Sequence, residues 1–153
     1  MKKTLVLLSS IGLIFSALAI DARAQTIIVD DSSPGFTAST NWLTGTGGYG
    51  GTFRYRLTAP VSDAATWSAS FKLSGTYKIS AWWVSGVNRT TSAPYIVYHS
   101  GGTTTVNRNQ QVNGGQWNVL GTFNLNSGVN QVRLSPWTAT GYVIIADAIM
   151  WQQ

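Results

Sequence analysis

A charge-free stretch of amides around a tryptophan holds side chains that are well suited to recognising a ligand. Residues 109–121 read NQQVNGGQWNVLG. Amides both donate and accept hydrogen bonds, and an aromatic ring packs on the apolar face of a sugar ring, so the combination suits a neutral, hydroxyl-rich ligand. A tight turn between two strands explains part of the same stretch, because Asn113-Gly114-Gly115 contains the residues that such turns prefer.

Aromatic, amide and guanidinium groups nearby extend this set of candidates. The candidate ligand-binding residues are Trp82, Asn88, Arg89, Tyr98, His99, Arg108 and Gln110. Each has a structural alternative: His99 can bond a turn, and the arginines can pair with Asp residues or bond loop carbonyls. Trp82 falls on the more polar face of its strand, whereas Trp83 and Trp117 fall on apolar faces and are expected in the core. Trp42 and Trp137 are expected in loops at one rim of the domain.

Three aspartates form a second constellation. Asp30, Asp31 and Asp147 come together if the first and last strands lie side by side, and clustered carboxylates are typical ligands of a structural calcium ion. In the alternative interpretation, Asp147 bonds backbone amides or pairs with Arg54 or Arg56.

The residues needed for common catalytic sites are missing, so the chain is interpreted as not being an enzyme. It contains no Glu, one His and no GxSxG motif, which argues against two-carboxylate glycoside hydrolysis and against a serine triad. The glycine-rich GTGGYGG at 45–51 lacks the Lys-Ser/Thr end and the helix of a phosphate-binding loop.

The first residues predict export. Two lysines, an apolar stretch and Ala22-Arg23-Ala24 indicate a signal peptide over residues 1–24, of a kind typical of bacteria, which leaves a single domain at 25–153. We therefore expect a secreted protein, extracellular or periplasmic, that is not inserted in a membrane after cleavage. Cys is absent, which excludes disulfide scaffolds and thiolate zinc sites. Without the signal peptide the net charge falls from +5 to +3, and the scattered basic residues argue against nucleic-acid binding.

Short runs rich in Val, Ile, Thr, Tyr and Trp, separated by Gly, Asn and Ser, predict an all-β protein. Strands are expected near 26–31, 40–44, 53–58, 64–71, 76–84, 94–99, 103–109, 116–125, 130–135 and 141–151. Turn residues at 73–75, 101–102 and 113–115 predict three hairpins. Alternation places Tyr77, Ile79, Ala81 and Trp83 on one face, while the continuously apolar 141–151 suggests a central strand. The expected architecture is a two-sheet antiparallel sandwich of the jelly-roll type.

Several segments together resemble a known family. GVNRTTSAPYIVYHSGGTTTVNRNQQVNGGQWNVLG, the terminal VIIADAIMW and the opening IVDDSSPGFTASTNW are similar to the golvesin C-terminal-like domain, also described as a xanthan-lyase carbohydrate-binding-like domain. The resemblance covers 27–152. It implies a galactose-binding-like jelly roll that accompanies secreted or surface enzymes, and carbohydrate binding rather than lyase activity.

These observations lead to two functional expectations. The first is a secreted, non-catalytic module that recognises a polysaccharide or cell-surface glycan, with a surface enzyme as a further partner. The alternative is a structural or adhesive extracellular protein without a specific small ligand, which would assemble through its exposed sheet edges.

Overall fold

The computed structural model describes residues 24–153, which fold into twelve β-strands without a helix. The predicted signal peptide lies outside the described residues except for Ala24. The strands are β1 (Thr26–Val29), β2 (Phe36–Thr37), β3 (Leu43–Thr46), β4 (Thr52–Leu57), β5 (Ala65–Phe71), β6 (Gly75–Trp82), β7 (Ala93–His99), β8 (Gly102–Arg108), β9 (Asn118–Leu125), β10 (Gly128–Leu134), β11 (Val143–Ala146) and β12 (Ala148–Gln152). Within the described part, no helix has the length and apolar character needed to cross a membrane.

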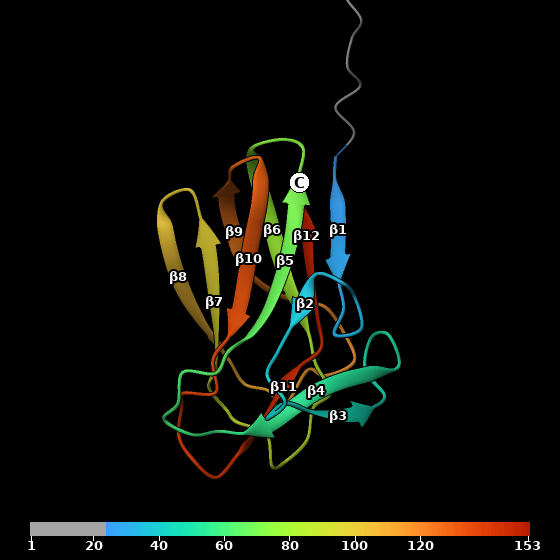
Figure 1. Cartoon of the computed structure of the whole chain (residues 1–153), viewed down its shortest axis with the longest axis vertical. Helices are drawn as coiled ribbons and strands as arrows, with labels where there is room; N and C mark the ends of the chain where they lie inside the picture. The colour runs from blue at the N-terminus through green and yellow to red at the C-terminus, as the bar shows by residue number, and fades with distance from the viewer. Residues whose placement is uncertain (1–23) are drawn as a thin grey trace, which may run out of the picture.

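The strands form three antiparallel sheets, of which two make a sandwich. One layer has the order β1-β12-β6-β9 and the other the order β2-β5-β10-β7-β8. The third sheet, β11-β4-β3, lies across one end of the sandwich, away from the two chain ends (Figure 1). The first and last strands pair side by side, with Ile28 opposite Met150, as predicted. The all-β sandwich expected from the sequence is confirmed.

Aromatic side chains from both layers build one core. The predicted inward face of β6 is confirmed, because Tyr77, Ile79, Ala81 and Trp83 are all fully buried. Contacts across the layers include Phe71 against Tyr77, with ring centroids 4.8 Å apart. Burial of each such side chain contributes roughly 1.5–3 kcal/mol, which is how a domain without disulfides is stabilised.

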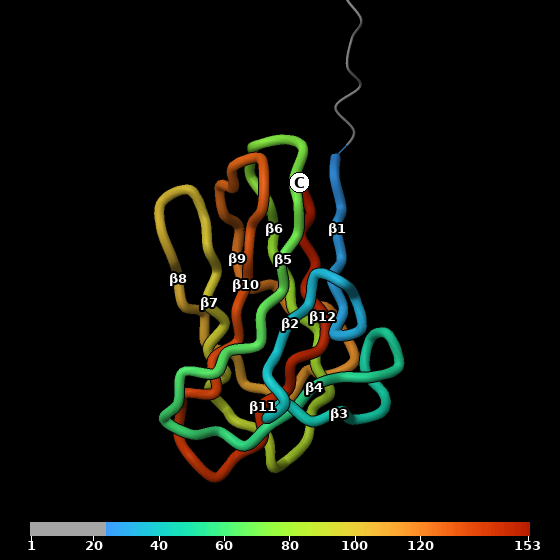
Figure 2. Tube along the Cα trace, viewed as in Figure 1, coloured from blue at the N-terminus to red at the C-terminus, as the bar shows by residue number. Residues whose placement is uncertain are grey.

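Only one of the three predicted hairpins is present. β7 and β8 pair through the turn at Gly101-Gly102, where Gly102 has a φ of 120°. The turns at 73–75 and 113–115 instead carry the chain from the five-stranded layer to the four-stranded layer (Figure 2). Turn residues mark where the chain reverses, but both kinds of connection need such residues, so the prediction of hairpins there was wrong.

The predicted strand 141–151 is in fact two strands in different sheets. β11 belongs to the small sheet and β12 is central in the four-stranded layer. The break falls at Asp147, whose carbonyl accepts a hydrogen bond from the Trp67 indole at 3.0 Å instead of continuing a ladder. The apolar run therefore reflects burial in two successive strands, and Asp147 is held at the junction of the sheets.

Gln110 is a structural residue of this junction. Its side chain is fully buried, and the amide donates to the Ile145 carbonyl (2.8 Å) and the Tyr95 hydroxyl (2.9 Å). Its carbonyl oxygen accepts from the Ile145 N–H at 2.8 Å. The prediction that Gln110 contacts a ligand is wrong, because its side chain is buried. Its amide bonds the backbone of β11 at a position where a neighbouring strand would otherwise do so.

Replacing Gln110 tests this role. Gln110→Ala leaves buried donors and acceptors on Ile145 and Tyr95 unpaired, so the free energy of unfolding should fall by about 2–4 kcal/mol in urea denaturation. The exposed Gln116→Ala is the matched control and should unfold like the unaltered protein. Equal stability of both variants would contradict the assignment.

Candidate functional site

Three aromatic rings gather on the outside of the four-stranded layer. Ring centroids are 5.6 Å apart for Tyr49 and Trp82, 5.0 Å for Tyr49 and Trp117, and 5.4 Å for Trp82 and Trp117. Tyr49 is 41% exposed, and both indoles are half-buried. We call these three residues the aromatic cluster. The rings meet at 55–71°, so they form an uneven, notched surface instead of a flat one.

Three different segments supply the cluster. Trp82 ends β6 on its outward face, and Trp117 immediately precedes β9, which pairs with β6 through Ala81 and Asn118. Trp117 was expected in the core, and that expectation was wrong. A β-bulge opposite Ile79 and Ser80 shifts the alternation of β9 by one residue, so the residues before it face the other way.

The tip of the β3–β4 hairpin delivers the third ring. Tyr49 stands between Gly47-Gly48 and Gly50-Gly51. Gly48 has a φ of 84°, which strongly favours glycine, and a Cβ on Gly50 would collide with the Asp30 carboxylate. Sequence reasoning missed Tyr49, although a single aromatic residue between two glycine pairs was a visible signal.

The Asp30, Asp31 and Asp147 carboxylates lie together, as the sequence suggested, and they lie directly beneath this hairpin. One oxygen from each lies within 4.8 Å of the others, and all three residues are buried. We call them the acidic cluster. Asp147 accepts the Tyr49 N–H at 3.1 Å, and Asp31 accepts the Thr52 hydroxyl at 3.1 Å, so the cluster holds both ends of the hairpin tip.

Burial and mutual repulsion make these carboxylates hard to ionise. The pKa of Asp147 is raised to about 7, mainly because the carboxyl group is buried. The charges of Asp30 and Asp31 raise this pKa further, whereas the hydrogen bond from the Tyr49 N–H lowers it. Burial also raises the pKa of Asp31, although Thr52 and Arg54 oppose the shift. The Nε of Arg54 lies 3.5 Å from Asp31 without a hydrogen bond, so it compensates the cluster only in part.

The acidic cluster has the chemistry of a hard-cation site. The Oδ1 atom of Asp30 is buried and has no hydrogen-bond partner among the described residues. Carboxylate oxygens are the ligands that Ca²⁺ prefers, and a buried oxygen with nothing to bond is costly unless a cation or proton neutralises it. The donor set therefore fits a calcium ion, held by Asp30, Asp31 and Asp147. The alternative to a metal site was that Asp147 bonds a backbone amide or pairs with Arg54 or Arg56. Asp147 does accept a hydrogen bond from a backbone amide, whereas Arg54 pairs with Asp31 and Arg56 pairs with Asp63.

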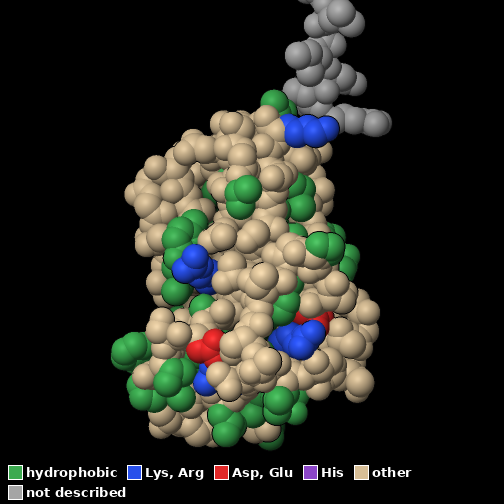
Figure 3. All heavy atoms as spheres, viewed as in Figure 1, with side chains coloured by type: hydrophobic (Ala, Val, Ile, Leu, Met, Phe, Trp, Pro, Cys, Tyr) green, Lys and Arg blue, Asp and Glu red, His purple; other side chains and the backbone are tan. Residues whose placement is uncertain are grey.

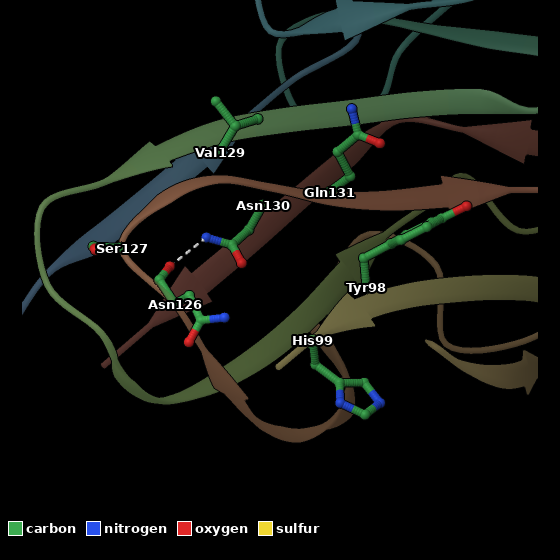
Figure 4. A pocket seen from close by; sticks show the side chains of 7 residues that line it. All are labelled: Tyr98, His99, Asn126, Ser127, Val129, Asn130 and Gln131. Carbon is green, nitrogen blue, oxygen red and sulfur yellow. Dashed lines mark hydrogen bonds between the residues drawn. The ribbon is translucent and has the colours of Figure 1, made fainter. Parts of the chain in front are cut away.

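Two candidate residues line a cleft on the other layer. Tyr98 and His99, at the end of β7, border a cleft of about 440 Å³ with residues of β10 and the turn before it (Figure 4). His99 contacts the Thr104 hydroxyl at 2.9 Å and stacks on Phe123. These contacts hold the His99 ring pointing away from Tyr98 (Figure 4), and both residues lie in the opposite layer from Trp82.

The remaining candidates make internal contacts. Arg108 donates to the carbonyls of Val119 (2.7 Å) and Leu120 (3.3 Å), which ties β8 to the bulged part of β9. Arg89 donates to the Val84 carbonyl and the Asn88 side chain, and burial lowers its pKa. The candidate residues thus fall into separate groups, and the aromatic and acidic clusters are the two that lie against each other.

Comparison with known proteins identifies the family. The family model of the Golvesin C-terminal domain matches residues 27–153. The chain belongs to this family. The resemblance noted from the sequence is confirmed, and the matched range covers every strand of the sandwich except the first residue of β1.

Solved structures share the fold. Paenibacillus xanthan lyase is 34% identical with a TM-score of 0.77, over 84% of this chain and 13% of the lyase chain. A family 35 carbohydrate-binding module from Clostridium thermocellum is 16% identical with a TM-score of 0.65, over 83% of this chain and 98% of the module. The family 35 module of Cellvibrio japonicus Abf62 is 18% identical with a TM-score of 0.60, over 83% and 92%. This chain thus spans a small part of the lyase and nearly all of each module. A search of the curated proteins matched nothing.

The acidic cluster predicts an unusual dependence of stability on pH. Between the ordinary Asp pKa of 3.8 and about 7, the folded chain keeps a proton on Asp147 that the unfolded chain releases. In a chelating buffer, stability should therefore fall as pH rises from about 4 to about 7, and Asp147→Asn should flatten this dependence. Urea denaturation at each pH measures it. Stability that rises with pH over this window would contradict the assignment.

Proposed function

We propose that the chain is a secreted, non-catalytic carbohydrate-binding module that recognises a polysaccharide through the aromatic cluster. The family and the likeness to carbohydrate-binding modules support the ligand class. The observation that carries the proposal is the group formed by Tyr49, Trp82 and Trp117 on the outside of the sandwich. Export rests on the signal peptide expected at residues 1–24.

The geometry of the cluster selects among polysaccharides. Rings inclined at 55–71° cannot all lie against one flat surface, such as the face of a crystalline fibre. They can contact two faces of one sugar residue or a twisted single chain, each ring packing on C–H groups. We therefore expect binding to hydrated or gel-forming polysaccharides and not to crystalline cellulose or chitin.

The surroundings of the ionisable residues support a non-catalytic role. His99 contacts a threonine and a phenylalanine instead of a nucleophile and a carboxylate. The carboxylates of the acidic cluster are buried beneath the hairpin, and Asp63 is paired with Arg56. In the described part of the chain, no pair of carboxylates therefore faces a groove where a glycosidic bond could lie. We propose a surface enzyme as a partner, because similar domains occur within larger enzyme chains.

Removing one ring of the aromatic cluster tests the binding surface. Trp82→Ala or Tyr49→Ala should weaken polysaccharide binding about tenfold, the equivalent of roughly 1.4 kcal/mol for one lost aromatic contact. Trp137→Ala is the matched control, since this loop indole is 61% exposed and outside the cluster. Affinity electrophoresis against a panel of soluble polysaccharides measures the effect, with circular dichroism to confirm folding.

Two results would contradict the proposal. The first is binding that Trp137→Ala weakens and the cluster variants do not. The second is the absence of binding across the whole panel, and concentration-dependent oligomers would then favour the structural or adhesive alternative.

We further propose that the acidic cluster holds a structural calcium ion. The unpartnered Asp30 oxygen is the observation that favours it. The ion would neutralise three buried carboxylates and so fix the hairpin tip that carries Tyr49. This role is structural and involves no chemical step.

Calcium should therefore raise the melting temperature of the chelator-treated protein. The expected increase is roughly 10 °C at a calcium concentration about a hundredfold above the Kd. Asp30→Asn should abolish the shift, while the control Asp63→Asn, which alters a carboxylate outside the cluster, should preserve it. Differential scanning calorimetry measures both, and an equal response of the two variants would contradict the site.

A further inference from the structure

The cleft beside Tyr98 forms because β7 leaves its partner strand early. The β7–β10 ladder ends at the pair Val97 and Val132. Beyond it, the Ser100 N–H donates to the Asn124 carbonyl of β9, in the other layer, at 2.9 Å. β7 is thereby drawn away from β10, and the gap becomes a cleft of about 440 Å³ on the outside of the five-stranded layer.

The walls of the cleft are mostly polar (Figure 4). It is lined by Tyr98, His99, Asn126, Ser127, Val129, Asn130 and Gln131. The Asn130 amide donates to the Asn126 carbonyl at 2.8 Å, which closes the turn at the end of the cleft. Amides with both donors and acceptors, beside a tyrosine ring, match the hydroxyls and C–H groups of a sugar.

Two residues that line the cleft are in contact with Arg133, whose guanidinium group forms no ion pair with a carboxylate of residues 24–153. Arg133 lies over the Tyr98 ring, 4.9 Å from its centroid, and donates to the Gln131 side chain at 3.1 Å. Its Nε is buried and has no hydrogen-bond partner in the described part of the chain. Contacts with two lining residues hold the group in place, which leaves donors available for an anion.

The distribution of charge favours an anionic ligand. The described carboxylate side chains are either in the buried acidic cluster or, for Asp63, paired with Arg56. In contrast, five basic residues form no ion pair within residues 24–153: Lys72, Lys78, Arg89, Arg108 and Arg133. On the face shown in Figure 3, each visible acidic side chain lies beside a basic one, while other basic side chains stand alone. The outer surface is therefore cationic, despite the modest net charge.

We propose that the β7–β10 cleft is a second glycan site, which binds a carboxylate-bearing sugar residue. Arg133 pairs with the carboxylate, and the amides of Asn130 and Gln131 bond the neighbouring hydroxyls. This inference rests on the proposed function, because it supposes a polysaccharide ligand, and it narrows that ligand to the acidic class. The site lies in the opposite layer from the aromatic cluster, so one molecule can contact two chains or two parts of one chain.

Paired acidic and neutral ligands test the inference. The probes are polygalacturonate, alginate and hyaluronan, each compared with its carboxyl-reduced derivative by isothermal titration calorimetry. At least one acidic form should bind about tenfold more tightly than its reduced form, and added salt should weaken that binding. Arg133→Gln should remove the preference, while Arg133→Lys should retain part of it. Lys72→Gln, which removes an exposed charge outside the cleft, should leave it unchanged.

The outcomes separate this inference from the proposed function. Equal affinity for acidic and reduced forms overturns the acidic site and leaves polysaccharide binding intact. A preference for acidic forms that Arg133→Gln and Lys72→Gln weaken equally also overturns it, because a diffuse charge effect would then be sufficient. Absence of binding to every form overturns both proposals. Circular dichroism of each variant excludes loss of folding as the cause.

Discussion

The burial of three carboxylates at one junction is the constraint on which much of this structure depends. Asp30 and Asp31 follow the first strand, and Asp147 separates the last two. Their oxygens approach within 4.8 Å, where like charges in a buried site strongly oppose ionisation. A folded chain must offset this repulsion with hydrogen bonds, protons or a cation. The Tyr49 N–H and the Thr52 hydroxyl supply some of the hydrogen bonds, and in doing so they dock the β3–β4 hairpin on the sandwich.

That docking links the stability of the fold to its candidate binding surface. The hairpin tip contributes Tyr49, and the sandwich contributes Trp82 and Trp117. Without the carboxylates beneath it, a tip made almost entirely of glycine would have little to order it. The aromatic cluster is therefore a product of tertiary packing between the small sheet and the four-stranded layer, and it exists only in the folded chain.

The sequence predicted the architecture more accurately than the candidate site. Alternation in β6 placed four residues in the core, and the expected pairing of the first and last strands placed the acidic residues together. The prediction that Trp117 lies in the core was wrong because a bulge in β9 reverses which residues before it face the core. Leu120 is accordingly 4% exposed, whereas Val119 is 50% exposed. The prediction for Gln110 was wrong for another reason. In the sequence, an amide that bonds the backbone of a buried strand looks the same as an amide that faces a ligand. Bulges and buried amides depend on partners distant in the chain, which local patterns do not reveal.

The central claim is that an uneven group of three rings, one exposed and two half-buried, recognises a polysaccharide. The indole N–H signals in a nuclear magnetic resonance titration with a binding oligosaccharide test it most directly, because seven tryptophans report from different places in one experiment. The account predicts that the signals of Trp82 and Trp117 shift in proportion to ligand occupancy, while those of the buried Trp42, Trp67 and Trp151 stay in place. Saturable binding that leaves the Trp82 and Trp117 signals unmoved would contradict it.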